Sequence, residues 1–338
     1  PSGEAAMTVD TNNAHLVLAG DIGGTNARFA IARVVDGRIV FDLQRELKVG
    51  DFAGVAEALA EFLRHAPAPT PAHACFAWAG PIDGRRARLT NGAWAVDADA
   101  LAARFRLPHL ALVNDFHAAA AGIDRVAEQD LVALQPGVAD PHGSRLVIGA
   151  GTGLGVAYAL RDGHGTRIVA GEGGHVAFAP LDDEQSELLA HCRRDLGRVT
   201  AEHLVSGGGI VRLYAFCRAR DGVAVPPDVT AGGAEEVVRR ADAGDAAAQR
   251  ALRLFCAILG AVAGDHALSC LASGGVFVAG GIAAKLAARL ADGTFRDAFD
   301  AKGTHAALMR RMPVWLVRDE ALGLRGAAAI ALADAGRA

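Results

Sequence analysis

The 338-residue sequence lacks several features that define large protein classes. It has no excess of basic residues: the net charge is −4, which gives no reason to expect nucleic-acid binding or a basic membrane face. Its five cysteines never occur at C-x-x-C spacing and mostly lie in apolar runs. This usage predicts buried thiols in a reducing cytosol rather than disulfides or zinc ligands.

Long hydrophobic runs and a signal peptide are also missing. The most apolar stretch, 252–263, is broken by Asp265 and His266, which makes it too short to span a bilayer and typical of a buried helix. Residues 1–15 are small and polar, and they predict a disordered N-terminal segment or a cloning remnant, with Met7 as the natural start. The chain length suits two domains, and an apolar share of 51% is ample for large cores.

Two well-known phosphate-binding signatures do not occur. No Gly-x-x-x-x-Gly-Lys-Ser/Thr is present, so the chain is not a P-loop protein. No Gly-x-Gly-x-x-Gly follows a strand-like run, which argues against a dinucleotide-binding Rossmann site.

What the sequence does contain is a glycine-rich motif that occurs twice. It reads Gly-Asp-Ile-Gly-Gly-Thr-Asn-Ala-Arg at 20–28 and Gly-Ala-Gly-Thr-Gly-Leu-Gly at 149–155. Each copy lies between two strand-like runs, and the second run ends at an Asp-Gly pair, Asp36-Gly37 or Asp162-Gly163. Asp-Gly between apolar runs is a strong hairpin signal because both residues need positive φ. Each half therefore predicts a strand, a glycine turn, a strand and a hairpin.

Glycine at such turns suits phosphate binding, because backbone N–H groups can approach a phosphate only where no Cβ intervenes. The threonine hydroxyls of Thr25 and Thr152 add donors at the rim. Asp21 cannot contact phosphate favourably itself, but a carboxylate there is useful if Mg²⁺ with its waters lies between them. Two tight hairpins without a ligand are the alternative.

The order of the elements predicts an α/β fold. Two related halves, each opened by the β-hairpin, would face each other across a cleft. The expected strands cover 16–21, 28–33, 38–43, 73–79, 110–113, a run from 146, 276–279 and 313–317. The expected helices cover 51–65, 97–105, a segment from 116, several long helices in the second half, a segment up to 290 and a last one from 323.

Polar residues gather after several of these elements. Asn114-Asp115 directly follows a buried strand, where open α/β sheets place ligand chemistry, although the pair taken alone is more often a helix cap than a binding site. Glu172 and His175 flank a Gly-Gly bend. Glu202 lies at the start of an expected helix that ends near 206–209, and Asn91 lies in an expected turn. These carboxylates, amides and imidazole suit a polyhydroxylated ligand. A plain turn and a favourable helix-terminus charge are the alternatives.

Through the motifs described above, the chain resembles the bacterial glucokinase family, which is the non-ROK group of the sugar kinase, Hsp70 and actin superfamily. The resemblance runs from residue 16 almost to the C-terminus. It is carried by the ordered motifs at 20–28, 90–94 (Thr-Asn-x-x-Trp), 114–116 (Asn-Asp-Phe), 149–157, 171–176 (Gly-Glu-Gly-Gly-His-Val), 201–202 with 206–207, and 274–282. It implies a two-lobed, ribonuclease H-like ATPase fold with a small domain (16–125 with a returning helix in 317–338) and a large domain (126–316).

The resemblance also implies roles for single residues. Asp115 would be the general base on the sugar 6-hydroxyl, and Asp21 would lie near Mg²⁺ through water. The groups that would hold the glucose hydroxyls are Asn91, Asn114, Asp115, Glu172, His175 and Glu202. The groups that would hold ATP are Asp21, Gly23, Gly24, Thr25, Asn26, Gly151, Thr152, Gly153, Gly280 and Gly281.

One departure from the family concerns Ala177, where the family often has Asp two residues after the histidine. It affects the support of the site rather than the activity. The zinc-binding Cys/His motif of ROK sugar kinases is missing, which argues against that sister group. A cytoplasmic homodimer that uses ATP and Mg²⁺ is the family expectation.

Three alternatives stay open. The same residues could serve a kinase for another hexose, such as mannose or fructose. A sugar sensor would need an attached DNA-binding module, and the short N-terminal segment cannot hold a helix-turn-helix. An actin-like filament former would not need the sugar-type polar cluster.

Overall fold

The computed structural model describes residues 16–66, 68–162 and 165–337. The segment expected to be disordered, 1–15, and Gly163 of the second Asp-Gly pair lie outside this part. The chain divides into two compact units, Pro1–Arg125 with Ala321–Ala338, and Val126–Glu320. The domain boundary drawn from the sequence at 317 differs by four residues from this division. Val317 still belongs to a strand of the second unit, and the Arg318 N–H donates to the Asp130 carbonyl at 2.8 Å.

Among the described residues, the first unit is built mainly from eight strands and four α-helices. They are β1 (Val17–Ile22), β2 (Asn26–Val35), β3 (Arg38–Lys48), α1 (Val55–Leu63), β4 (His73–Trp78), β5 (Ile82–Asp83), β6 (Arg86–Arg88), β7 (Ala95–Asp97), α2 (Ala98–Phe105), β8 (His109–Asn114), α3 (Asp115–Gly122) and α12 (Leu322–Ala335).

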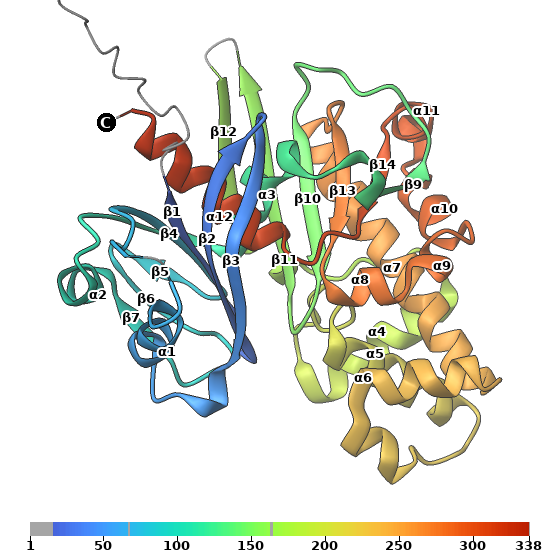
Figure 1. Cartoon of the computed structure of the whole chain (residues 1–338). Helices are drawn as coiled ribbons and strands as arrows, with labels where there is room; N and C mark the ends of the chain where they lie inside the picture. Colours follow the sequence, from blue (N-terminus) through green and yellow to red (C-terminus); the bar gives the residue numbers. More distant parts are fainter. Residues whose placement is uncertain (1–15, 67, 163–164, 338) are drawn as a thin grey trace, which may run out of the picture. The chain divides into compact units, whose positions relative to one another are not determined.

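The second unit holds the remaining strands and α-helices together with the 3-10 helix η4 (Figure 1). They are β9 (Leu131–Gln135), β10 (Arg145–Ala150), β11 (Leu154–Asp162), β12 (Gly165–Gly171), the short 3-10 helix η4 (Gly173–His175), α4 (Asp183–Leu196), α5 (Gly207–Arg220), α6 (Pro227–Asp242), α7 (Ala246–Cys270), β13 (Gly275–Ala279), α8 (Gly281–Lys285), α9 (Ala287–Leu290), α10 (Thr294–Asp300), α11 (Ala306–Met309) and β14 (Val314–Val317).

Both units contain the same arrangement of five strands. The order is β3-β2-β1-β4-β8 in the first sheet and β12-β11-β10-β13-β14 in the second, where β9 adds an antiparallel edge strand. In each sheet the first three strands are antiparallel, and the central strand is parallel to the next two. The α/β class and the duplication predicted from the two glycine motifs are thereby confirmed. The cleft between the halves stays a prediction.

The predicted hairpins form where the Asp-Gly pairs occur. Asp36 and Gly37 join β2 to β3 with φ of 49° and 76°, as the Asp-Gly signal requires. Asp162 pairs with Gly165 at the end of the β11–β12 hairpin. The second hairpin strand is longer than expected, because β3 continues to Lys48. Its last residues alternate between exposed and inward-facing side chains and do not form an apolar run.

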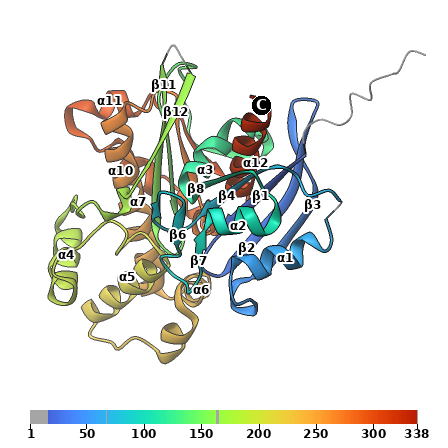
Figure 2. The same cartoon turned by 90° about the vertical axis from the view of Figure 1, so that its left-hand side faces the viewer.

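The first sheet is covered on both faces, and β1 shows how the sequence alternates between them. Leu18 and Ile22 pack in the cluster that includes the apolar sides of α1 and α2. Val17 and Ala19 pack on the other face against Leu324 and its neighbours on α12. Figure 2 shows α1 and α2 in front of this sheet, with the C-terminal helix behind it. The strand is therefore buried on both sides, as its unbroken apolar run indicates.

The core of the second unit is centred on α7. The sequence predicts a helix too short for a bilayer, but the structure extends it to 25 residues, Ala246–Cys270, which is long and apolar enough to span one by length and composition alone. Within the described residues, 78% of its most apolar window is buried inside the protein. The buried-helix prediction is thus confirmed and the length prediction is wrong.

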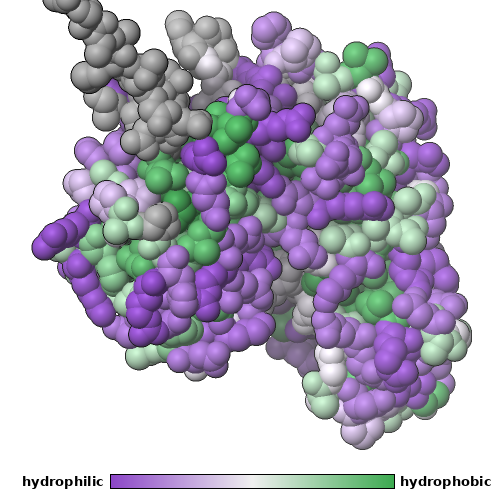
Figure 3. All heavy atoms as spheres, viewed as in Figure 1, coloured by the Kyte–Doolittle hydropathy of each residue, from purple (hydrophilic) through white to green (hydrophobic). Residues whose placement is uncertain are grey.

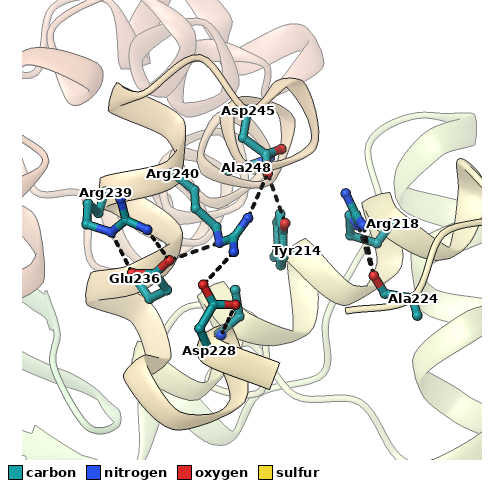
Figure 4. A network of polar contacts seen from close by, with 10 residues as sticks. Tyr214, Arg218, Ala224, Asp228, Glu236, Arg239, Arg240, Asp245 and Ala248 are labelled. Atoms are coloured by element: carbon teal, nitrogen blue, oxygen red, sulfur yellow. Dashed lines mark hydrogen bonds and ion pairs between the residues drawn. The ribbon is translucent and has the colours of Figure 1, made fainter. Parts of the chain in front are cut away.

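A polar network fastens α5 and α6 to the start of α7 (Figure 4). The Arg240 guanidinium donates to Glu236 at 3.0 Å and to Asp228 at 2.5 Å, and it lies 3.7 Å from Asp245. Tyr214 donates to the same Asp245 at 3.0 Å, and the Asp245 carboxylate also caps α7. One carboxylate thus links three helices.

The sequence predictions missed the small sheet β5-β6-β7. Its strands are two or three residues long and include Arg86 and Arg88, so no apolar alternation signals them.

Large hydrophobic side chains that stay exposed, such as Val34, Val138 and Leu271, are spread over several elements. On the face shown in Figure 3, hydrophobic areas alternate with hydrophilic ones. The homodimer stays a prediction.

Candidate active site

In the first unit, three parallel strands end at one edge of the sheet. Ile22 on β1 is in register with Trp78 on β4, and Trp78 is in register with Asn114 on β8. Asp21 and Asp115, which lie next to the ends of this row, therefore share the carboxyl edge of the sheet. This is the edge where open α/β sheets bind ligands.

Asn114 and Asp115 form the junction between β8 and α3. Asn114 is the N-cap: its Oδ1 accepts hydrogen bonds from the N–H groups of Phe116 (2.9 Å) and His117 (3.3 Å). The capping alternative is correct for this oxygen, while the amide nitrogen can donate to a ligand. Asp115 is the first residue of α3, and its Oδ1 accepts from the Phe116 N–H at 3.0 Å. This bond orients the half-buried carboxylate at a helix end that favours negative charge.

The first glycine turn, Gly23 to Thr25, connects β1 to β2. The Gly23 N–H donates to the Asn26 carbonyl at 2.9 Å, which closes the turn. A Cβ on Gly24 would overlap the backbone carbonyl oxygen of Asn91. Gly24 is therefore needed for the approach of the Asn91 turn as well as for any phosphate, and this contact brings Asn91 to the carboxyl edge of the sheet.

Asp21 lies beside the first turn of α12. A Cβ on Gly323 would come within 3.0 Å of the Asp21 Oδ2. Burial raises the pKa of Asp21, against the weaker opposing effect of Arg28, whose Nη1 is 3.9 Å away. The Arg28 Nε is bound to Glu46 at 2.7 Å. A desolvated carboxylate with so little charge compensation fits a hydrated divalent cation such as Mg²⁺.

Lys48 is a charged residue of this region that the sequence predictions missed. Its Nζ donates to the Asn26 Oδ1 at 2.8 Å. Lys48 on β3 faces Asn26 on β2 in the antiparallel pair of strands. It places a cation beside the first glycine turn. The signal that could have found it is the polar alternation that continues β3 beyond residue 43.

The second glycine turn, Gly151 to Gly153, joins β10 to β11 in the same way. The Gly151 N–H donates to the Gly153 carbonyl at 2.8 Å. A Cβ on Gly151 would meet nothing within 4 Å, so this side of the turn is open, as a phosphate cradle requires. Gly280 follows the neighbouring strand β13 with φ of +94°, and a Cβ there would lie 2.6 Å from the Ala150 carbonyl. The glycines assigned to phosphate and adenosine are thus neighbours.

Glu202 connects this turn to the Gly-Gly bend. Its Oε2 accepts from the Leu154 N–H at 2.9 Å, and its own N–H donates to the Gly174 carbonyl at 2.9 Å. The His175 Nε2 lies 4.0 Å from the Glu202 Oε1 and 3.8 Å from the Glu172 Oε2. The structure therefore brings Glu172, His175 and Glu202 together.

The prediction of a helix that starts around Glu202 is wrong. Glu202 lies in a turn, and the glycines expected to end a helix begin α5 instead. Ser206 is the N-cap, since its Oγ accepts from the Gly209 N–H at 3.1 Å. Gly209 is needed there because a Cβ would overlap the Leu204 backbone.

Ala177, the departure from the family, is exposed and pairs through its backbone with Thr200.

A second cluster of donor atoms lies at the opposite edge of the first sheet, where β4 and β8 begin. His73, His109 and Asp334 hold their ligand atoms within 4.8 Å of one another. The two imidazole rings stack 4.3 Å apart at an interplanar angle of 7°. Parallel rings direct their lone pairs side by side instead of toward one ion, while the His73 Nδ1 is 3.0 Å from the Asp334 Oδ2. We assign this cluster to the docking of α12.

Each unit thus assembles its own group of the residues expected from the sequence. The first unit holds Asp21, Gly23, Gly24, Thr25, Asn26, Asn91, Asn114 and Asp115. The second unit holds Gly151, Thr152, Gly153, Glu172, His175, Glu202, Gly280 and Gly281.

Comparisons with known proteins identify the family of the chain. A family model described as Glucokinase matches residues 18–334. A glucokinase from Chromohalobacter salexigens is 40% identical over 316 residues, covering 92% of this chain and 95% of that protein. The crystal structure of a glucokinase from an Antarctic psychrotroph is 32% identical with a TM-score of 0.84, over 93% of this chain and 98% of that one.

A more distant structure shares the fold. Glucokinase from Balamuthia mandrillaris, solved in complex with glucose, has a TM-score of 0.79 at 23% identity, over 96% of this chain and 95% of that one. The family match over nearly all of the chain, together with the duplicated sheets and the two assembled groups, leads to one conclusion. The chain belongs to the glucokinase family.

Proposed function

We propose that this chain transfers the γ-phosphoryl group of ATP to the 6-hydroxyl of D-glucose, with Asp115 as the general base. The observation that carries the proposal is the placement of Asp115 at the end of β8, in the row of strand ends that also carries Asp21 and the first glycine turn. Membership of the glucokinase family supports the substrate and the reaction class. The absence of a ROK-type Cys/His motif supports the non-ROK group.

In the first unit, we assign the chemistry to the β8–α3 junction. The Asp115 carboxylate would accept the proton of the 6-hydroxyl as this oxygen attacks phosphorus in line. A positioned base contributes roughly 10² to 10⁴ in rate. The hydrogen bond from the Phe116 N–H to the Asp115 Oδ1 orients this carboxylate at the start of α3. The Asn114 and Asn91 side chains would orient the sugar.

In the second unit, we assign sugar binding to Glu172, His175 and Glu202, because the His175 Nε2 lies 3.8 Å from the Glu172 Oε2 and 4.0 Å from the Glu202 Oε1. The open side of Gly151 and the neighbouring Gly280-Gly281 turn would receive the nucleotide. Thr152 and Thr25 would donate from the rims of the two turns. Mg²⁺, when bound near Asp21 through water, would neutralise phosphate charge. The homodimer and the cytoplasmic location remain predictions.

A coupled assay of ATP with glucose, mannose and fructose tests the proposal on the purified chain. We expect glucose to give the highest kcat/KM. Asp115→Asn keeps the shape of the side chain and removes the base, so we expect kcat to fall by about 10² to 10⁴ while ATP binding by calorimetry and the far-UV spectrum are retained.

The matched control is Asp36→Asn, at the far end of β2 from the glycine turn, in a position where Asn also accepts positive φ. It should retain wild-type turnover. Turnover of Asp115→Asn near the wild-type value would refute the assigned base. A higher kcat/KM with mannose or fructose would show that glucose is not the preferred substrate. Sedimentation that depends on ATP, without phosphorylation of any hexose, would favour the filament alternative.

A further inference from the structure

His266 is a buried polar residue that the proposed mechanism does not use. It lies on α7, the long helix at the core of the second unit, and only 7% of its surface is exposed. Both of its ring nitrogens have partners: the Nδ1 is 2.7 Å from the Tyr158 hydroxyl, and the Nε2 is 3.3 Å from the Gly173 carbonyl oxygen. The sequence treats it only as an interruption of an apolar run.

The chemistry of the two partners determines the tautomer. A carbonyl oxygen only accepts, so the Nε2 must carry the proton that it donates to Gly173. In a neutral ring the Nδ1 is then an acceptor, and it receives the Tyr158 hydroxyl proton. Burial lowers the pKa of His266, which keeps the ring neutral. The chain of donors therefore runs from β11 through α7 to the Gly-Gly bend.

Gly173 is the place where the bend rests on the core. A Cβ there would come within 2.7 Å of the Val156 Cβ and 3.1 Å of the His266 Cε1, so the backbone lies directly against both side chains. Its carbonyl also accepts from the Val176 N–H at 3.4 Å, which closes η4. His266 thus binds the backbone between the two residues assigned to the sugar, Glu172 and His175.

The bend has few other polar contacts with the core. The Gly174 carbonyl accepts from the Glu202 N–H, and the His175 carbonyl accepts from Arg198 at 3.3 Å. Both partners lie on the segment after α4, on the Glu202 side of the bend. His266 is a side-chain anchor from α7, so it sets the position of Glu172 and His175 relative to the helix core.

We propose that His266, with its tautomer held by Tyr158, is a positioning residue for the sugar-binding bend Glu172–His175. This assignment rests on the proposed function. It predicts that His266 acts on sugar affinity through the Gly173 backbone and contacts no substrate itself. A merely structural histidine would affect stability and leave the two Michaelis constants unchanged.

The experiment compares three variants with one control. His266→Phe removes both bonds and fills the space, Tyr158→Phe removes only the bond that selects the tautomer, and His266→Asn keeps an N–H donor. The control is Gln135→Met. Gln135 is equally buried in the same unit and donates to two carbonyls, those of Met309 (2.8 Å) and Met312 (3.0 Å), but it lies on β9 and does not contact the bend.

We expect the glucose KM of His266→Phe to rise about tenfold, the loss associated with one hydrogen bond, while the ATP KM changes less than about twofold. Tyr158→Phe should show a smaller rise, and His266→Asn should recover part of the loss. Gln135→Met should lose stability in urea and keep its glucose KM. An unchanged glucose KM in His266→Phe, or an equal rise of both constants, would overturn the proposal.

Hydrogen exchange separates this proposal from the proposed function. In His266→Phe, the amides of residues 173–176 should exchange faster than in the wild type, and in Gln135→Met they should not. If the wild-type chain phosphorylates no hexose, the proposed function fails, and faster exchange would still support the positioning of the bend. Exchange at the wild-type rate would refute the anchor whichever substrate the enzyme uses.

Discussion

Gly24 and Gly151 each directly precede the threonine of their glycine turn, but a methyl group would meet different surroundings at each. At Gly24 it would overlap the Asn91 carbonyl, and at Gly151 it would point into open space. The same residue type in the same motif therefore serves close backbone packing in one unit and an accessible turn in the other. A single sequence cannot distinguish the two uses.

Alanine at these glycines separates the two uses. We expect Gly24→Ala to lower the free energy of unfolding by about 1–3 kcal/mol, because the Asn91 turn must move. Gly151→Ala should keep its stability and raise the KM for ATP. Gly50→Ala, where a Cβ meets nothing within 4 Å, is the control for both. Urea unfolding and ATP kinetics give the two readouts, and equal stability of all three variants would contradict the structure.

One buried histidine and two half-buried ones make the stability depend on pH. Burial lowers the pKa of His117, His203 and His266 in the folded chain below the ordinary value of 6.5. Below pH 6.5 the unfolded chain therefore binds protons that the folded chain does not, and the free energy of unfolding must fall as the pH falls. Asp21, whose folded pKa is raised, opposes this trend closer to its ordinary value of 3.8.

We expect the urea midpoint to decrease from pH 7 to pH 5.5 and to be nearly constant between pH 7 and pH 8, below the range in which the unfolded thiols ionise. Replacing one of these histidines, as in His117→Gln, should make the decrease smaller. A midpoint that stays constant or rises on acidification would show that these rings are protonated in the folded chain.

At the scale of elements, α3 and α12 illustrate what a local pattern misses. Both are rich in small residues, and their backbones approach each other at two glycines. A Cβ on Gly326 would overlap the Ala118 carbonyl, and one on Gly122 would lie 2.7 Å from the Leu322 carbonyl. Figure 1 shows α12 beside β1 and β4, although it comes from the other end of the chain. The alanine-rich sequence predicts the helix but not this partner.

Gly326→Ala tests this crossing. Alanine in a helix is ordinarily more favourable than glycine by about 1 kcal/mol, so a solvent-facing site would be stabilised. Here we expect a loss of about 2 kcal/mol or more, because the helices must separate. The control is Gly336→Ala at the end of α12, where a Cβ would lie 3.5 Å from the Leu332 carbonyl and should change little. Stabilisation of Gly326→Ala in urea would contradict the crossing.

At the scale of the whole molecule, all five thiols are protected by folding, one in the first unit and four in the second. Burial raises the pKa of Cys75 and Cys256 to about 12 and of Cys270 to about 11, and it also raises the pKa values of Cys192 and Cys217. At neutral pH these groups are therefore neither nucleophilic thiolates nor partners in disulfides.

We expect the native chain to react slowly with a disulfide reagent at pH 8, with the half-buried Cys270 first, and to expose five reactive thiols in denaturant. A urea series followed by mass spectrometry compares Cys75 with the other four and reports whether the two units unfold together. Rapid labelling of Cys75 or Cys256 in the native chain would contradict their burial.

The sequence by itself determined the features that depend on neighbours along the chain. The two glycine turns, the Asp36-Gly37 hairpin, the strand before Asn114 and the class of the fold follow from local conformational limits and hydrophobic periodicity. The duplication was readable because both copies keep the same turn between the same kinds of strand. The short sheet β5-β6-β7 and the start of α5 escaped prediction, because distant packing and a cap override a weak local pattern there.

Only the tertiary structure decided which distant groups meet. It brought Asn91 against Gly24, Gly323 against Asp21, and Glu202 against both the second turn and the bend. It also placed His266 under Gly173. Such contacts depend on strand register and on the depth at which helices pack. These are set by side chains far apart in the sequence, and no local pattern records them.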